Sequence, residues 1–168
     1  LVETRTKAQS IIMAGQVSVN EKIITKSGNL FTEDSKIIIR KLHPDWVSRG
    51  ALKLLKAIDF FKIDIKNKIC LDIGSSTGGF TQVLLKYYAK KIFAVDVGTN
   101  QLHEKLRNEK NIVSIENVNA KYLDNSIIPE KIDLIVCDVS FISLKKVIYP
   151  SLKFLDNNSE IIALIKPQ

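Results

Sequence analysis

A glycine-rich segment between an apolar run and a helical pattern constrains this chain more than any other feature. The segment reads Leu71-Asp72-Ile73-Gly74-Ser75-Ser76-Thr77-Gly78-Gly79-Phe80. Glycines let the backbone approach a ligand closely, and the first turn of the following helix has free N–H groups. Asp96 ends the next predicted strand, where its carboxylate can accept the hydroxyls of a ribose. The segment predicts an adenosine-like ligand at the carboxyl edge of a sheet; the alternative is a tight turn without a ligand.

The spacing within this segment argues against two common nucleotide sites. A phosphate-binding P-loop would place a lysine after Gly79, but Phe80 stands there. A dinucleotide fingerprint needs a glycine where Ser76 stands. The form Asp-x-Gly-x-x-x-Gly-Gly instead resembles the first motif of class I methyltransferases, which implies S-adenosyl-L-methionine as the cofactor.

Beyond this segment, apolar runs of strand length alternate with amphipathic helical patterns. Such alternation is typical of an α/β fold with a mostly parallel sheet that helices cover on both faces. We predict helices over 49–61, 79–88, 101–108 and 144–155, and strands over 69–72, 92–96, 112–115, 134–138 and 160–165.

The first 41 residues have a different pattern. A helix is predicted over residues 4–14, with Gly15 as its stop, followed by short strands near 17–19, 23–24 and 36–40. We therefore predict a small N-terminal α+β domain over 1–41, a linker over 42–48 that contains Pro44, and a larger domain over 49–168. The chain begins with Leu1 and stops just after a strand pattern, so both domains are expected to be truncated.

Composition narrows the possible partners. A net charge of +7 favours anionic partners such as nucleic acid. No apolar run reaches the roughly 20 residues that span a bilayer, so membrane insertion is not expected. Cys70 and Cys137 lie in apolar strand patterns, which indicates buried thiols in a reducing cytoplasm, and no metal site is expected.

Three polar residues suggest chemistry at the predicted sheet edge. Asp138 and Lys166 end the fourth and fifth strands, and Lys53 lies on the helix before the first strand. A ribose 2′-hydroxyl is a poor nucleophile, so its methylation needs a nearby base, and a lysine serves when burial or neighbouring cations lower its pKa. Asp138 would orient the lysines and balance their charge. The alternatives are a solvated helix lysine and a salt bridge at the strand ends.

Several longer strings together resemble the haemolysin A-type (TlyA) family of ribosomal RNA 2′-O-methyltransferases. Its members join an S4 RNA-binding domain to an FtsJ/RrmJ-like methyltransferase domain with a Rossmann-like fold. The matching strings cover nearly the whole chain: Glu3 to Gln9, Ile12 to Gly15, Val47 to Leu54, Leu71 to Thr81, Ala94 to Gly98, Asp138 to Leu144 and Ala163 to Gln168.

The resemblance implies site residues and partners. The family's catalytic set is Lys-Asp-Lys-Glu, whose first three members fall on Lys53, Asp138 and Lys166; the glutamate would lie beyond Gln168. The substrates implied are cytidine 2′-hydroxyls of 16S rRNA, 23S rRNA or both, within ribosomal subunits. The residues expected at the cofactor are Asp72, Gly74, Ser75, Ser76, Thr77, Gly78, Gly79, Phe80, Asp96, Val97, Asn119, Ala120 and Asp138. Those expected at RNA are Arg5, Lys7, Gln9, Lys22, Lys26 and Arg49.

Two other functions compete with this interpretation. One is an RNA-binding protein that keeps the fold without turnover. The presence of Lys53, Asp138 and Lys166 argues against it, whereas the missing glutamate keeps it open. The other is a membrane-acting haemolysin, the activity that named the family. The short, fully apolar strands argue against a pore, because a spanning barrel needs strands of about 10 residues with one lipid-facing side.

Overall fold

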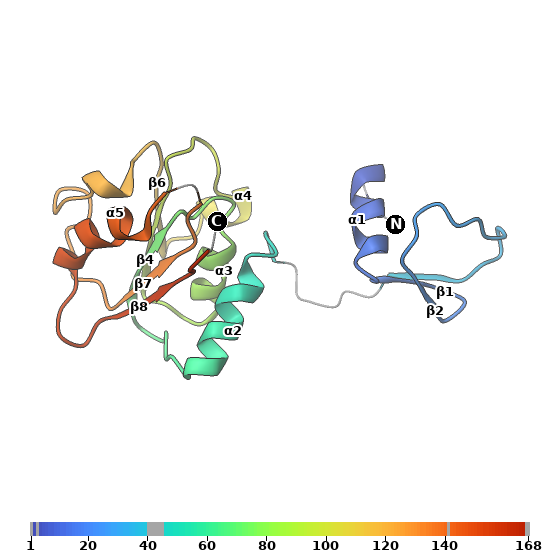
Figure 1. The fold of residues 1–168 in the computed structure, drawn as a ribbon, viewed down its shortest axis with the longest axis horizontal. Helices are drawn as coiled ribbons and strands as arrows, with labels where there is room; N and C mark the ends of the chain where they lie inside the picture. Colours follow the sequence, from blue (N-terminus) through green and yellow to red (C-terminus); the bar gives the residue numbers. More distant parts are fainter. Residues whose placement is uncertain (1, 3, 40–45, 141, 167–168) are drawn as a thin grey trace. The chain divides into compact units, whose positions relative to one another are not determined.

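The computed structural model describes residues 2, 4–39, 46–140 and 142–166, and it divides the chain into two compact units (Figure 1). The N-terminal unit comprises Leu1–Asp45 and the C-terminal unit Trp46–Gln168. The predicted linker 42–48 lies mostly outside the described residues. Its last three residues belong to the C-terminal unit.

The N-terminal unit consists of one helix and a small antiparallel sheet. Helix α1 (Arg5–Met13) precedes strands β1 (Val17–Val19), β2 (Lys22–Ile24) and β3 (Ile37–Ile39), which pair in the order β2-β1-β3. Gly15, with a φ of 69°, ends the helix region. Its N–H donates to the carbonyl of Ile12. The predicted helix and strands are present; Arg40, predicted to end the third strand, lies outside the described residues.

The C-terminal unit is built on a parallel sheet of five strands. The strands are β4 (Ile69–Ile73), β5 (Lys91–Val95), β6 (Ile112–Ile115), β7 (Leu134–Cys137) and β8 (Glu160–Ala163). Their order is β6-β5-β4-β7-β8, and every neighbouring pair is parallel. The prediction of an α/β fold with a parallel sheet is confirmed. The chain order reverses at β4, so ligands of such sheets bind beyond its carboxyl end.

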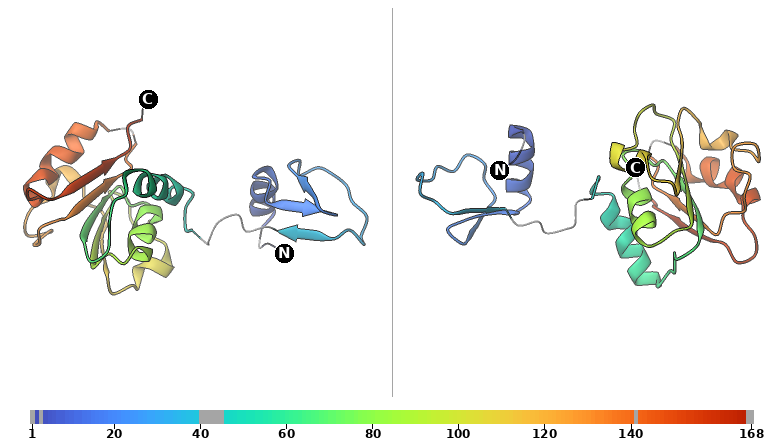
Figure 2. Two further views of the ribbon diagram at one scale, coloured as in Figure 1. Left: turned by 90° about the horizontal axis from the view of Figure 1, so that it is seen from below. Right: turned by 180° about the vertical axis from the view of Figure 1, so that it is seen from behind.

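Helical segments cover both faces of this sheet (Figures 1 and 2). The helices α2 (Ala51–Phe61), α3 (Gly79–Lys86) and α4 (Glu104–Arg107) contribute to one hydrophobic cluster. The 3₁₀ turns η1 (Ala120–Tyr122) and η2 (Tyr149–Phe154) and helix α5 (Leu144–Ile148) contribute to the other.

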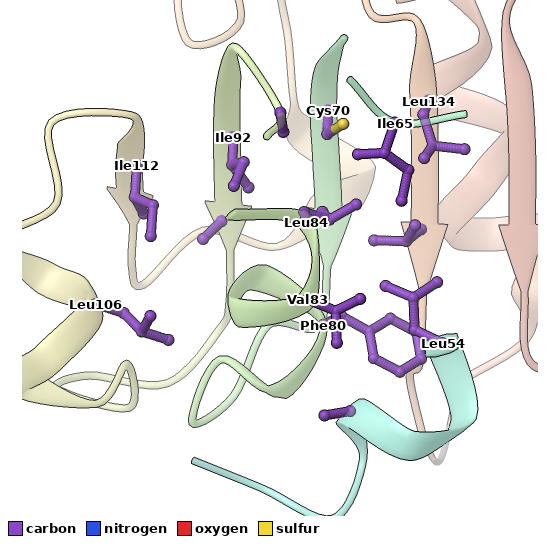
Figure 3. Packing of buried hydrophobic residues seen from close by; sticks show 14 of the residues in the cluster. Leu54, Ile65, Cys70, Phe80, Val83, Leu84, Ile92, Leu106, Ile112 and Leu134 are labelled. Atoms are coloured by element: carbon purple, nitrogen blue, oxygen red, sulfur yellow. The ribbon is translucent and has the colours of Figure 1, made fainter. Parts of the chain in front are cut away.

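Alternate residues of the central strands enter opposite clusters. On β4, Cys70 faces the cluster of α2 and α3, whereas Leu71 faces the cluster of α5. Figure 3 shows Cys70 with Leu54 and Phe80 from the two helices on its side. This period of two, combined with burial on both faces, explains why the strands read as continuous apolar runs.

Two predicted helices are shorter than expected. The segment 101–108 contains only the single turn of α4, capped by His103, whose Nδ1 accepts from the backbone N–H of Lys105 at 3.2 Å. The segment 144–155 changes from α-helix to 3₁₀ at Tyr149, because Pro150 has no N–H and its ring disfavours a continuing α-helix. The last strand ends at Ala163 rather than 165, so Lys166 lies beyond it.

Candidate active site

The turn after β4 brings backbone atoms close to a neighbouring loop. The N–H groups of Gly74 and Ser75 both donate to the carbonyl of Val95, at 2.9 and 3.1 Å, which fixes the turn beside β5. Gly74 has a φ of 79°, and a Cβ there would lie 2.9 Å from Cγ1 of Val139. Only glycine fits this position, because its backbone is left-handed and Val139 and the backbone of Asp138 occupy the space that a Cβ would take.

The other two glycines of the motif allow elements to pack closely. Gly78 has a φ of 93°, and a Cβ there would lie 2.4 Å from a methyl carbon of Leu106 and 2.7 Å from one of Leu102. At Gly79 a Cβ would lie 3.1 Å from the backbone nitrogen of Ala51. Part of the glycine pattern is therefore explained by packing of α3 against its neighbours.

Asp72 lies in the interior behind the turn. Its side chain is almost fully buried on the α3 side of β4, and Oδ2 accepts a hydrogen bond from Thr81 Oγ1 at 2.6 Å. Within the described residues Oδ1 receives no hydrogen bond. Burial raises the pKa of Asp72 to about 7, and the charges of Asp138 and Asp96 act in the same direction. Asp72 thus supports the turn from the interior through its hydrogen bond with Thr81.

On the β5 side, Asp96 is held in place by backbone donors. The N–H of Ser76 donates to its Oδ2 and the N–H of Gly98 to its Oδ1, each at 2.8 Å. Every carboxylate oxygen can accept two hydrogen bonds, so both oxygens keep capacity for a ribose diol. Asn119 begins η1 and accepts from the N–H of Lys121 at 3.1 Å. These contacts orient both side chains before any ligand binds.

A cleft of about 930 Å³ opens at the carboxyl edge of the sheet. Most residues predicted to hold the cofactor line it: Gly74, Ser75, Ser76, Thr77, Gly79, Phe80, Asp96, Val97, Asn119, Ala120 and Asp138. Asp72 and Gly78 are not among its lining residues; both are buried. The three residues predicted to carry the chemistry, Lys53, Asp138 and Lys166, also line the cleft.

These three side chains form one ionic cluster although they come from three segments. The carboxylate of Asp138, just after β7, accepts from Lys53 Nζ at Oδ2, at 2.9 Å. Lys166 Nζ lies 2.6 Å from the other oxygen, Oδ1, and donates to Ser140 Oγ at 2.7 Å. Lys53 is half exposed, whereas Lys166 and Asp138 are more enclosed. Two ammonium groups therefore share one carboxylate at the mouth of the cleft.

The balance of charges fixes the protonation state of the carboxylate. Burial alone would raise the pKa of Asp138, but the nearby ammonium groups of Lys166 and Lys53 outweigh burial and lower the pKa below its usual value. Asp138 is thus a carboxylate at neutral pH, suited to orient the two lysines. With two cations and one anion, the cluster carries a net positive charge that attracts an anionic substrate.

The residues predicted to contact RNA fall into both units. Arg5, Lys22 and Lys26 are exposed on the N-terminal unit, and Gln9 is half-buried. The side chain of Lys7 lies outside the described structure. Arg49 is exposed in the C-terminal unit and lines the cleft beside Gly50. Arg49 thus lies at the candidate active site.

Several lining residues were not singled out from the sequence. Ser48 and Gly50 precede α2, and Val139, Ser140 and Ile142 follow Asp138. They lie within two strings that resemble the TlyA family, Val47 to Leu54 and Asp138 to Leu144, but the strings alone did not tell a cleft wall from an ordinary loop. Among the described residues no group of three or more histidine, cysteine or acidic side chains is arranged to hold a metal ion.

Comparison with known proteins agrees with this geometry. The family described as FtsJ-like methyltransferase matches residues 46–168. The chain is 48% identical over 168 residues to hemolysin A of Brachyspira hyodysenteriae. It is 37% identical over 169 residues to the 16S/23S rRNA (cytidine-2′-O)-methyltransferase TlyA of Mycobacterium tuberculosis. A solved structure from Streptococcus thermophilus, described as a hemolysin, superposes with a TM-score of 0.75 at 38% identity.

The matches cover nearly all of this chain but only part of the relatives. They include 99% of the chain and 69% of hemolysin A, 100% and 63% for TlyA, and 99% and 62% for the Streptococcus structure. The chain thus spans about two thirds of the length of these relatives. The family match covers the whole C-terminal unit, with its glycine turn, its cleft and its lysine–aspartate cluster, and the chain belongs to the FtsJ-like methyltransferase family.

Proposed function

We propose that this protein transfers a methyl group from S-adenosyl-L-methionine to the 2′-hydroxyl of a cytidine ribose in 16S or 23S rRNA. The observation that carries the proposal is the cluster of Lys53, Asp138 and Lys166 in the same cleft as the glycine turn. The relative named TlyA is a 16S/23S rRNA (cytidine-2′-O)-methyltransferase by its name, and it shares 37% identity with the chain.

The cleft residues fit the proposed methyl donor. Asp96 faces the cleft with two oriented oxygens for the ribose, and Gly74 and Ser75 of the glycine turn line the same cleft. Ala120 and Val118 supply apolar wall on the same side, which suits an adenine ring. When bound, S-adenosylmethionine would supply a methyl group on a sulfonium, which leaves as a neutral thioether.

The chain's own contribution is placement of the hydroxyl and removal of its proton. A lysine of the cluster, once it has lost a proton to solvent, can take the proton of the 2′-hydroxyl as the oxygen attacks. Asp138 holds both lysines in position and balances their charge. Because positioning of two bound reactants can supply about 7 to 11 kcal/mol, we expect it to contribute most of the rate.

Contacts to RNA would come from both units. Arg49 at the cleft and the exposed cations Arg5, Lys22 and Lys26 are suited to phosphate groups. The target nucleotide would have to leave its stack to reach the cleft. We further propose that the substrates are ribosomal subunits in the cytoplasm, with the N-terminal unit in the role of an S4-like RNA-binding domain.

Transfer of labelled methyl groups tests this function. The protein and radiolabelled S-adenosylmethionine are incubated with isolated 30S and 50S subunits from a bacterium that lacks this modification. The expected result is label in rRNA, at a cytidine that resists alkaline cleavage on its 3′ side. A lack of label in both subunits, or equal labelling by Lys166→Ala, would contradict the assignment.

A second candidate function is membrane lysis, and its only support is the name of the relative hemolysin A. Among the described residues no helix is long and apolar enough to cross a membrane. A lysis assay with purified, detergent-free protein separates the two functions. The membrane activity would be favoured if the parent transfers no methyl group and the Asp138→Ala variant lyses cells as strongly as the parent. An RNA-binding protein without turnover would show RNA binding but no label in the transfer assay.

A further inference from the structure

We propose that Ser140 is a positioning residue that sets the direction of the Lys166 amine during methyl transfer. This inference rests on the proposed function and concerns the same cleft. Ser140 lies two residues after Asp138 and lines the cleft, and its side chain is exposed to it. Its Oγ accepts a hydrogen bond from Lys166 Nζ at 2.7 Å.

The two contacts of Lys166 Nζ differ in geometry. The contact to Ser140 Oγ satisfies both the distance and the angles of a hydrogen bond. Asp138 Oδ1 lies closer, at 2.6 Å, but within the described residues it receives no hydrogen bond of standard geometry. Asp138 therefore attracts the ammonium mainly through charge, which is not directional, whereas Ser140 fixes the direction of one N–H bond.

The backbone holds Ser140 and Lys166 within reach of each other. They follow neighbouring strands of the sheet, β7 and β8, which pair in register up to Cys137 and Ala163. Beyond this pair, the N–H of Leu164 donates to the carbonyl of Cys137 at 2.9 Å. The two chain segments therefore leave the sheet side by side, and the contact does not depend on a chance approach of two flexible loops.

The direction of the N–H bonds of Lys166 matters because it determines where the lone pair of the neutral amine points. After an ammonium gives one proton to solvent, the amine keeps two N–H bonds and one lone pair in a tetrahedral arrangement. With one N–H directed at Ser140 and the other drawn to Asp138, the lone pair of Lys166 takes the remaining direction. The 2′-hydroxyl then gives its proton to that lone pair while its oxygen forms the bond to the methyl carbon, and the bond from that carbon to the donor sulfur breaks with its electron pair left on sulfur. Without Ser140 the amine can rotate about its last carbon–carbon bond.

Three variants test the role of this hydroxyl. Ser140→Ala removes it, Ser140→Thr keeps it, and Ser143→Ala is the matched control, because Ser143 starts α5 without a side-chain cap hydrogen bond. We expect Ser140→Ala to lower kcat about tenfold with unchanged KM for donor and RNA, since loss of alignment slows only the chemical step. Ser140→Thr and Ser143→Ala are expected to stay within about twofold of the parent, on the same reasoning.

The pH dependence of kcat separates positioning from a structural role. A hydroxyl that accepts from an ammonium stabilises that protonated form more than the amine. Loss of this hydroxyl in Ser140→Ala should therefore move the ascending limb of the pH–rate profile to lower pH, by about half a unit. Ser140→Thr should restore the parental limb. A tenfold loss with an unmoved limb, or a full rate in Ser140→Ala, would overturn the proposal.

A measurement without turnover distinguishes failure of this inference from failure of the proposed function. Lysine ammonium protons held by an acceptor exchange slowly enough to give a ¹H–¹⁵N signal in cold, slightly acidic solution. The Lys166 signal, assigned by its loss in Lys166→Arg, is expected in the parent and in Ser140→Thr. Its protons are expected to exchange with water severalfold faster in Ser140→Ala, where the ion pair with Asp138 remains without the hydroxyl. A parent that transfers no methyl group contradicts the function; an unchanged exchange rate in Ser140→Ala contradicts the role of Ser140.

Discussion

The two units of this protein use hydrophobic residues in different ways. In the C-terminal unit, strands of four or five residues are covered on both faces, and side chains such as Leu54, Leu71 and Leu134 are completely buried. In the N-terminal unit the strands have three residues each, and Leu30 is 97% exposed. Residues of α1 and the small sheet line an apolar hollow of about 200 Å³.

This difference in packing suggests that the two units contribute differently to catalysis and to RNA binding. A densely packed sheet can hold a group that is costly to bury, such as the carboxyl of Asp72. The smaller unit has less core to offset such costs, but it presents exposed cations. We therefore expect changes in the C-terminal unit to affect chemistry and stability, and changes of N-terminal cations to affect RNA affinity.

The largest effect is expected from the ionic cluster. Lys166→Ala should lower methyl transfer at least about 100-fold, because it removes the proposed proton acceptor. The folded structure should persist, since Lys53 still pairs with Asp138. The check is the rate of label transfer at saturating RNA, together with a thermal melt. Transfer within about threefold of the parent would assign the chemistry to another residue.

The buried carboxyl of Asp72 is expected to make the stability of the C-terminal unit depend on pH. Its pKa is raised by burial to about 7 in the folded state, above the ordinary value of 3.8 for an exposed aspartate. The folded state therefore binds the extra proton, and its stabilising contribution, complete below pH 3.8, is lost as pH rises through about 7. The loss amounts to no more than about 4.5 kcal/mol, at about 1.4 kcal/mol per pKa unit.

Asp72→Asn tests this dependence, because asparagine keeps an acceptor for Thr81 but does not ionise. The variant should gain stability relative to the parent as pH rises from 4 to 8, measured by urea unfolding at each pH. If the free energies of unfolding of parent and variant change in parallel across this pH range, Asp72 has the same pKa in the folded and unfolded states, which contradicts the prediction.

A pair of glycine substitutions compares the packing of the two units. Gly78→Ala should destabilise the C-terminal unit by about 3 kcal/mol, from left-handed backbone strain and overpacking against Leu106. Gly28→Ala in the N-terminal unit is the control, because a Cβ there meets no atom within 4 Å. Urea unfolding of both variants checks the contrast; equal stabilities would contradict it.

The sequence predicted the sheet and most of the cleft well because both depend on local patterns. Each strand is a short apolar run, and Asp138 follows one directly. Boundaries that depend on packing were harder to predict, such as the early end of the last strand at Ala163. The role of Gly78 in packing against Leu102 and Leu106 could not be predicted, since the pattern that favours ligand approach also favours close helix contact.

The cations of the N-terminal unit are expected to have the smallest effect. Lys22→Ala and Lys26→Ala should each weaken rRNA binding by a few fold, about 1 kcal/mol or less, if each side chain contacts one phosphate. Each should also reduce the slope of log affinity against log salt by about 1. The rate of transfer at saturating RNA should stay at the parental value, because the proposed chemistry uses residues of the C-terminal unit and both lysines belong to the N-terminal unit. Filter binding over a salt series measures the slope, with Glu21→Gln as a control that removes a neighbouring negative charge. A lower saturated rate with an unchanged salt slope would break the proposed division between affinity and chemistry.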